Sequence, residues 1–97
     1  MASPSQLVHQ ICDLDCKFRR ACQQVELLNT NITDLKQRYQ RAVRDNSRGF
    51  RCSVRLRLAS YESVRNMMYE YASHKCEEIE NLQDQLLQML ELSLIHI

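Results

Sequence analysis

The chain has 97 residues, of which 44% are hydrophobic, 26% are charged and 6% are aromatic, with a formal net charge of +1. This length and composition allow one folded domain at most and exclude a disordered polar tail. Glycine and proline occur once each. Strands joined by hairpins need such turn residues, so the chain is expected to consist of long helices.

A helix is predicted to begin at about residue 4 and to end at about residue 45. Ser3 is a suitable N-cap, Pro4 suits the first helical position, and Gln6 completes a capping box with Ser3. These three residues precede a long periodic pattern of apolar side chains.

The periodic pattern is a heptad repeat, in which apolar residues recur in alternating steps of four and three. We call its eleven members the first seam: Leu7, Ile11, Leu14, Phe18, Ala21, Val25, Leu28, Ile32, Leu35, Tyr39 and Ala42. Such a repeat predicts a coiled-coil helix, and branched residues at its a positions favour parallel two-stranded coils. The flanking e and g positions offer few opposite charges for self-pairing, so a partner in the same chain or in another protein stays open.

A bend is predicted at residues 46–49. The first seam fails where Asn46 and Gly49 occupy its next two positions. Residues 45–49 form the only cluster in the chain that is typical of turns. Glycine costs roughly 1 kcal/mol in a helix interior relative to alanine, which also favours a break here.

A second helix is predicted over residues 50–91. Its apolar stripe follows a period near 3.6 more than a strict heptad, so it could bury against more than one neighbour. A leucine heptad is absent, and Arg65 and Lys75 interrupt the stripe. The stripe consists of Phe50, Val54, Leu58, Tyr61, Val64, Met68, Ala72, Ile79, Leu82, Leu86 and Met89. Residues 82–90 are the richest in leucine and methionine.

Two helices of nearly equal length around one bend predict an all-α protein that folds as an antiparallel helical hairpin. The alternative is one long bent helix that forms a dimeric coiled coil. Either arrangement forms a single coiled-coil domain over residues 1–91.

The last six residues, 92–97, are expected to be foreign to the protein. They back-translate readily to CTG-TCT-CTT-ATA-CAC-ATC, which resembles an adapter of transposon-based sequencing libraries. The chain is then a truncated fragment that lacks its natural C-terminus. The alternative is a genuine apolar tail.

Charge is distributed unevenly along the chain. Residues 36–65 contain nine basic and two acidic side chains, whereas residues 66–97 contain six acidic side chains and one lysine. Arginines near the bend form a candidate surface for phosphate, anionic lipid or an acidic protein; they are Arg44, Arg48, Arg51, Arg55 and Arg57. The alternative is a solvated face that pairs with the acidic second half.

A metal site is a weaker hypothesis. His9, Cys12 and Cys16 share one helical face and are soft ligands, but a fourth ligand must come from the second helix, from His74 or Cys76. Ordinary thiols are the preferred interpretation, so no metal or cofactor is predicted. Five cysteines without a visible signal peptide indicate a reducing compartment, the cytoplasm or alternatively the nucleus. No stretch approaches the length of a membrane span.

The sequence contains no motif of an enzyme, such as a glycine-rich phosphate loop or a zinc-protease helix. We therefore expect a non-catalytic protein–protein interaction module, a scaffold or adaptor subunit that forms homo- or hetero-oligomers. Its expected partner-binding residues come from the first seam and from the end of the second helix: Leu7, Ile11, Leu14, Phe18, Val25, Leu28, Ile32, Leu35, Tyr39, Leu82, Leu86 and Met89. The alternatives are a nucleic-acid or anionic-surface binder at the bend and a self-assembling structural rod.

Overall fold

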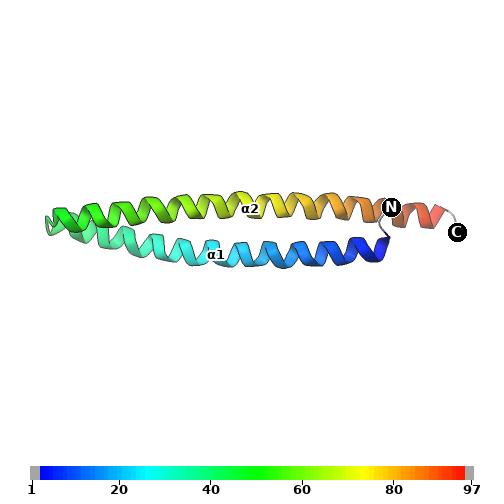
Figure 1. The fold of residues 1–97 in the computed structure, drawn as a ribbon, viewed down its shortest axis with the longest axis horizontal. Coiled ribbons are helices and arrows are strands. Elements are labelled where there is room, and N and C mark those ends of the chain that lie inside the picture. The colour runs from blue at the N-terminus through cyan, green and yellow to red at the C-terminus, as the bar shows by residue number, and fades with distance from the viewer. Residues whose placement is uncertain (1–2, 96–97) are drawn as a thin grey trace. The chain divides into compact units, whose positions relative to one another are not determined.

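The computed structural model describes residues 3–95 and the side chains of residues 3–92. It consists of two α-helices, α1 (Pro4–Arg44) and α2 (Arg48–Ile95), which run antiparallel to each other (Figure 1). No strand occurs among the described residues. The predicted all-α helical hairpin is confirmed, and the alternative of one continuous bent helix is wrong, because the chain reverses at residues 45–47.

The first helix begins where the capping box predicts. The backbone N–H of Gln6 donates to Ser3 Oγ at 3.2 Å, and the N–H of Ser3 donates to Gln6 Oε1 at 3.0 Å. Pro4 is the first helical residue. Two backbone donors that a helix start leaves without partners are therefore satisfied by side chains.

The turn between the helices is built by Asn46 rather than by Gly49. Asn46 adopts the left-handed conformation with φ 55°, and its N–H donates to the carbonyl of Val43 at 3.2 Å. The N–H of Ser47 reaches the carbonyl of Ala42 at 3.0 Å. These two bonds form a Schellman motif, which closes the last turn of α1.

The predicted bend at 46–49 is therefore too long at its C-terminal end. Gly49 lies in the first turn of α2, and a methyl group at its Cβ position would meet no atom within 4 Å. Asparagine is the residue other than glycine that most readily adopts the left-handed conformation, so Asn46 reverses the chain without the glycine.

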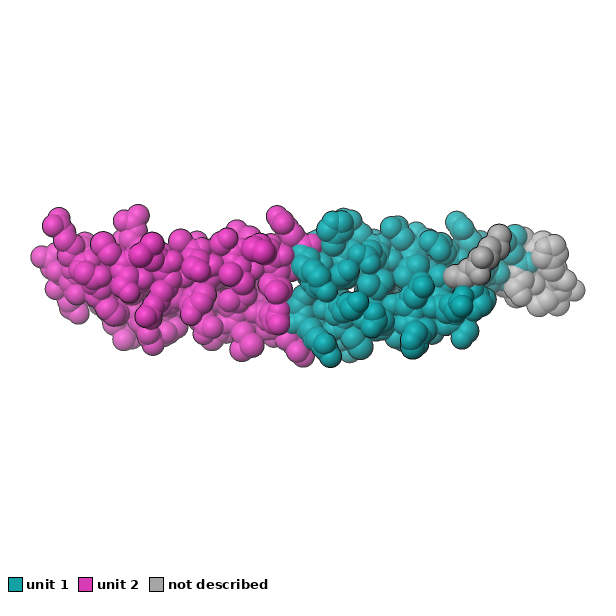
Figure 2. Space-filling model, in the orientation of Figure 1, with its two compact units in different colours: residues 1–21, 71–97 teal, residues 22–70 magenta. Residues whose placement is uncertain are grey.

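Two compact units make up the chain (Figure 2), and each contains a segment of both helices. Unit 1 comprises residues 1–21 and 71–97, and unit 2 comprises residues 22–70. The buried apolar side chains of unit 1 are Leu7, Leu14, Ala21 and Ala72. Those of unit 2 are Val25, Ile32, Leu35, Ala42 and Val54.

The first seam faces α2 along its whole length, because all eleven of its residues are buried or half-buried. By contrast, the charged residues of α1 are exposed, with the exception of Asp15. The heptad repeat thus correctly predicts which face of α1 packs against a second helix.

The prediction of a 3.6-residue period in α2 is wrong. Apart from Glu62 and Cys76, the buried and half-buried residues of α2 also follow a strict heptad, which includes three cations. We call these twelve positions the second seam: Arg51, Val54, Leu58, Tyr61, Arg65, Met68, Ala72, Lys75, Ile79, Leu82, Leu86 and Met89. Tyr61 is the one exposed member of this set, at 37%. Phe50 and Val64, which the sequence places in the stripe, lie beside it and are 49% and 42% exposed.

Cations occupy the second seam because their long aliphatic stems cover apolar neighbours while the charged ends reach polar groups. Lys75 Nζ lies 3.1 Å from Glu78 Oε1 and 5.3 Å from the centre of the Tyr71 ring. Arg65 Nη1 donates to Asn29 Oδ1 at 3.5 Å. These cations interrupt the hydropathy pattern of the sequence, whereas in the structure they are half-buried residues of the second seam.

The second helix continues to Ile95, beyond the predicted end at residue 91. The segment predicted to be foreign, 92–97, therefore begins within α2, and its residues 96–97 lie outside the described residues. Neither helix, as far as the structure describes it, has a stretch that is long and apolar enough to cross a membrane.

Candidate interaction surfaces

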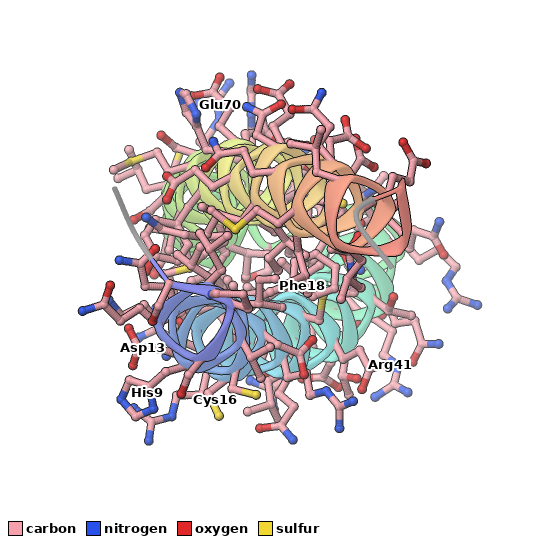
Figure 3. The ribbon with its side chains drawn as sticks, turned by 90° about the vertical axis from the view of Figure 1, so that its right-hand side faces the viewer. His9, Asp13, Cys16, Phe18, Arg41 and Glu70 are labelled. Carbon is pink, nitrogen blue, oxygen red and sulfur yellow. The ribbon has the colours of Figure 1, made fainter. Side chains whose placement is uncertain are left out.

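The first seam is occupied by the partner helix of its own chain. In Figure 3 the Phe18 side chain lies between the two helices, whereas His9, Asp13 and Cys16 point outward from α1. The other predicted partner-binding residues of α1 are likewise buried or half-buried against α2. A second protein reaches this seam only if the hairpin opens.

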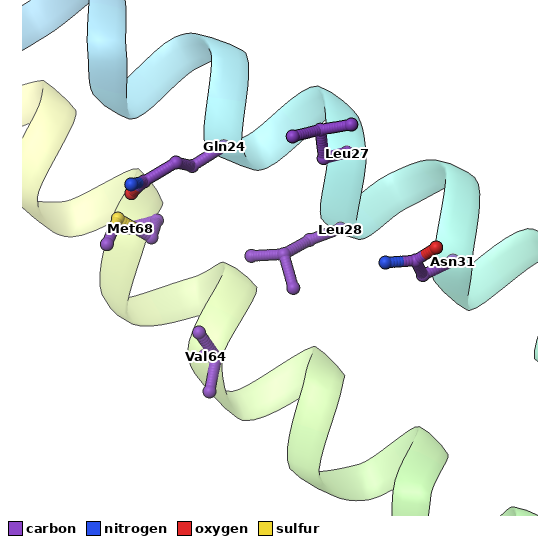
Figure 4. Close-up of a pocket in the computed structure, with 6 residues that line it drawn as sticks. All are labelled: Gln24, Leu27, Leu28, Asn31, Val64 and Met68. Carbon is purple, nitrogen blue, oxygen red and sulfur yellow. The ribbon is translucent and has the colours of Figure 1, made fainter.

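An apolar groove remains open between the helices of unit 2. Residues of both helices line it (Figure 4). Its volume is about 280 Å³. Leu27 and Val64 stand at its edges and are 66% and 42% exposed. The side chains that line it are Gln24, Leu27, Leu28, Asn31, Val64 and Met68. The surface of the groove is mainly apolar, and its polar lining residues are Gln24 and Asn31.

The other flank of unit 2 is polar. Asn29 Nδ2 donates to Tyr69 Oη at 3.4 Å, and Lys36 Nζ lies 3.8 Å from Glu62 Oε1. Asn29 also accepts the hydrogen bond from Arg65. In an antiparallel helix pair, e positions of one helix lie beside e positions of the other, and g positions lie beside g positions. The two flanks of the pair therefore differ in composition: one has this polar network and the other has the groove.

The leucine- and methionine-rich end of α2 lies in unit 1. Leu82, Leu86 and Met89 are half-buried second-seam residues. Leu87 and Leu90 point away from the seam and are exposed. The predicted residues at this end therefore belong mainly to the contact with α1. The exposed apolar surface there is supplied by Leu87 and Leu90.

The arginines predicted near the bend are only partly brought together. Arg48, Arg51 and Arg55 line one pocket of about 230 Å³ with Tyr39 and Cys52. The side chain of Arg44 is exposed and is not part of this pocket.

The remaining predicted arginine, Arg57, lines a separate pocket with Arg38 and Asp34. There Asp34 Oδ2 lies 3.0 Å from Arg38 Nε, so that pocket already contains a carboxylate. Three of the five predicted arginines thus form one cluster.

The weak metal hypothesis gains no geometric support. Among the described residues, no three His, Cys, Asp or Glu side chains are grouped so that they could hold a metal ion. Cys12 and Cys16 are exposed on α1, and Cys76 Sγ lies 3.8 Å from Glu80 Oε1 on α2.

Sequence reasoning missed the groove. The signal for it was present in Leu27 and Val64, which are large apolar residues outside the two seams. Comparisons with protein-family models, with curated proteins and with solved structures find no significant match to this chain. The functional argument therefore depends on the physical chemistry of these surfaces.

Proposed function

We propose that this chain is a non-catalytic coiled-coil module for protein–protein interaction, a scaffold or adaptor subunit that binds an amphipathic helix of another protein. The observation that carries the proposal is the apolar groove of unit 2, where Leu27 at the edge is 66% exposed. Fully burying a leucine side chain contributes about 1.5–3 kcal/mol, so covering this groove is favourable.

A helix is the occupant that fits a groove between two paired helices. An apolar stripe spaced i, i+3, i+4 and i+7 lays its side chains between α1 and α2, as in other helix-in-groove recognition. Met67 lies one turn from Val64 on the same face of α2 and is 65% exposed, which extends the apolar surface beyond the groove. Because α1 and α2 are already paired, binding orders only the partner, which lowers the entropic cost.

The first seam and the end of α2 are also candidate docking surfaces in this proposal. The closed hairpin offers the groove, and in unit 1 it offers Leu87 and Leu90 as a second apolar surface. The first seam itself becomes a docking surface only for a partner that displaces α2. The cytoplasm or nucleus remains the expected location, on the cysteine content of the sequence.

The test is proximity labelling in the native cell with the unmodified chain and two variants. The first variant, Leu27→Lys with Met67→Lys, places charges in the proposed contact. The control, Leu56→Lys, changes a leucine that is 74% exposed and lies outside the groove. All three positions are exposed, so each variant is expected to keep the helical circular dichroism of the parent chain.

We expect a set of labelled partners that is shared by the parent chain and the Leu56→Lys control and is lost from the groove variant. Partners retained by the groove variant would show that the groove is not the docking surface. Sedimentation equilibrium tests the alternative of a self-assembling structural rod. If the measured mass grows with concentration for the parent chain and falls to that of a monomer for the groove variant, the groove binds a second copy of this chain.

A further inference from the structure

The pocket near the turn gathers three arginines without a carboxylate. The ion pairs among the described side chains use Lys17, Arg19, Lys36, Arg38 and Lys75. None of these ion pairs includes an arginine of the pocket. Unit 2 as a whole has nine basic and five acidic side chains, so the surrounding charge is also positive.

Positive charges that line one pocket repel one another, and an anion placed among them removes that repulsion. Guanidinium groups suit phosphate in particular, because their planar fork donates two parallel hydrogen bonds to two oxygens. Arg51 is half-buried at a seam position, which restricts its side chain, whereas Arg48 and Arg55 are exposed and free to close on a ligand. Tyr39, also half-buried, adds a phenol to the same pocket.

We propose that this pocket binds the phosphate monoester of an anionic lipid headgroup, so that the turn of the hairpin docks on a membrane surface. Apolar side chains on both sides of the turn favour a lipid surface over nucleic acid. Val43 and Phe50 flank residues 45–47 and are 46% and 49% exposed. Basic clusters with exposed apolar neighbours bind anionic bilayers, because the cations meet the headgroups and the apolar groups enter the interface.

The test is co-sedimentation of the full chain with vesicles of phosphatidylcholine that contain a phosphatidylinositol phosphate. Reference vesicles have the same surface charge but contain phosphatidylserine, which has no phosphate monoester. We expect tighter binding to the first vesicles. Each arginine removed from the pocket is expected to weaken binding by roughly fivefold, so Arg48→Gln with Arg55→Gln weakens it by roughly 25-fold.

Three further variants separate the pocket from a diffuse basic surface. Arg44→Gln removes an exposed arginine near the turn that does not line the pocket, and Arg20→Gln removes one from unit 1. Both are expected to bind much more tightly than the double pocket variant. The charge-preserving pair Arg48→Lys with Arg55→Lys keeps the general attraction and loses the forked geometry, so its preference for the phosphate monoester is expected to disappear.

Four outcomes would overturn the proposal. Equal binding to both kinds of vesicle would show that there is no site for the phosphate monoester. A loss of vesicle binding in Arg44→Gln as large as that in Arg55→Gln would show that the pocket is not the binding site. Binding of soluble inositol phosphate as tight as that of vesicles assigns the pocket to a free phosphate ligand instead of a membrane. Stronger binding of single-stranded DNA than of vesicles at the same salt concentration assigns it to nucleic acid. Circular dichroism of each variant verifies that the helices are intact.

Discussion

Replacing Arg65 by methionine should stabilise the hairpin. Arg65 occupies a second-seam position in unit 2, and its Nε is buried without a hydrogen-bond partner among the described groups. Its Nη1 donates a hydrogen bond to Asn29 Oδ1 that is 3.5 Å long. Methionine has a flexible apolar side chain that follows the stem of the arginine and leaves no buried donor without a partner.

The expected change in the free energy of unfolding follows from the unpaired Nε and from the long hydrogen bond of Nη1. A buried donor without a partner costs about 1–3 kcal/mol, whereas a hydrogen bond as long as 3.5 Å contributes about 0.5 kcal/mol or less. Because Arg65 is only half-buried, the lower part of the first range applies. We therefore expect Arg65→Met to raise the free energy of unfolding by about 1 kcal/mol. For a domain of this size, that corresponds to a rise in Tm of about 4–8 °C.

The assay is thermal and urea unfolding followed by circular dichroism at 222 nm, with Arg20→Met as the matched control. Arg20 is exposed on α1, so the same substitution there should change stability by less than about 0.5 kcal/mol. A lower Tm for Arg65→Met than for the parent chain, with the control unchanged, would refute the reasoning and show that the buried guanidinium contributes net stability. The experiment is done at several protein concentrations, because a more apolar second seam also favours self-association.

Three smaller predictions test the local structure by the same unfolding assay. Asn46→Gly should stabilise the chain by some tenths of a kcal/mol and Asn46→Ala should destabilise it by about 1 kcal/mol, because φ at this residue is 55°. Ile32→Ala should cost about 2–5 kcal/mol because Ile32 is buried, whereas Leu56→Ala, at a 74% exposed position, should cost less than about 0.5 kcal/mol. Ser3→Ala should cost about 0.5–2 kcal/mol, since it removes one half of the capping box; an unchanged melting curve would mean that the box does not stabilise α1.

Much of the fold follows from the sequence because the first seam and the helix start are local signals. The capping box needs only Ser3 and Gln6, and the heptad of α1 is apolar without interruption, so both patterns predict the observed structure. The turn is predicted to within a few residues. Which residue takes the left-handed conformation depends on the Schellman bonds at Ala42 and Val43, and composition alone favours Gly49 over Asn46.

The second seam and the groove were not predictable from periodicity because each depends on the opposite helix. Arg65 lies in the second seam, where its Nη1 donates to Asn29 of the opposite helix α1. Val64 is an exposed groove residue rather than a core residue only because α1 packs on the neighbouring face of α2. Hydropathy assigns apolar residues to the core and charged residues to the surface, and both assignments fail here for the same reason.

The cations of the second seam also explain why the chain forms a hairpin and not a dimer of one long helix. In a parallel dimer, Arg51, Arg65 and Lys75 would each face their own copy in the seam, and like charges brought together there are destabilising. In the hairpin they face the first seam, which contains no charged residue. The two seams are thus complementary to each other and unsuited to self-pairing in parallel.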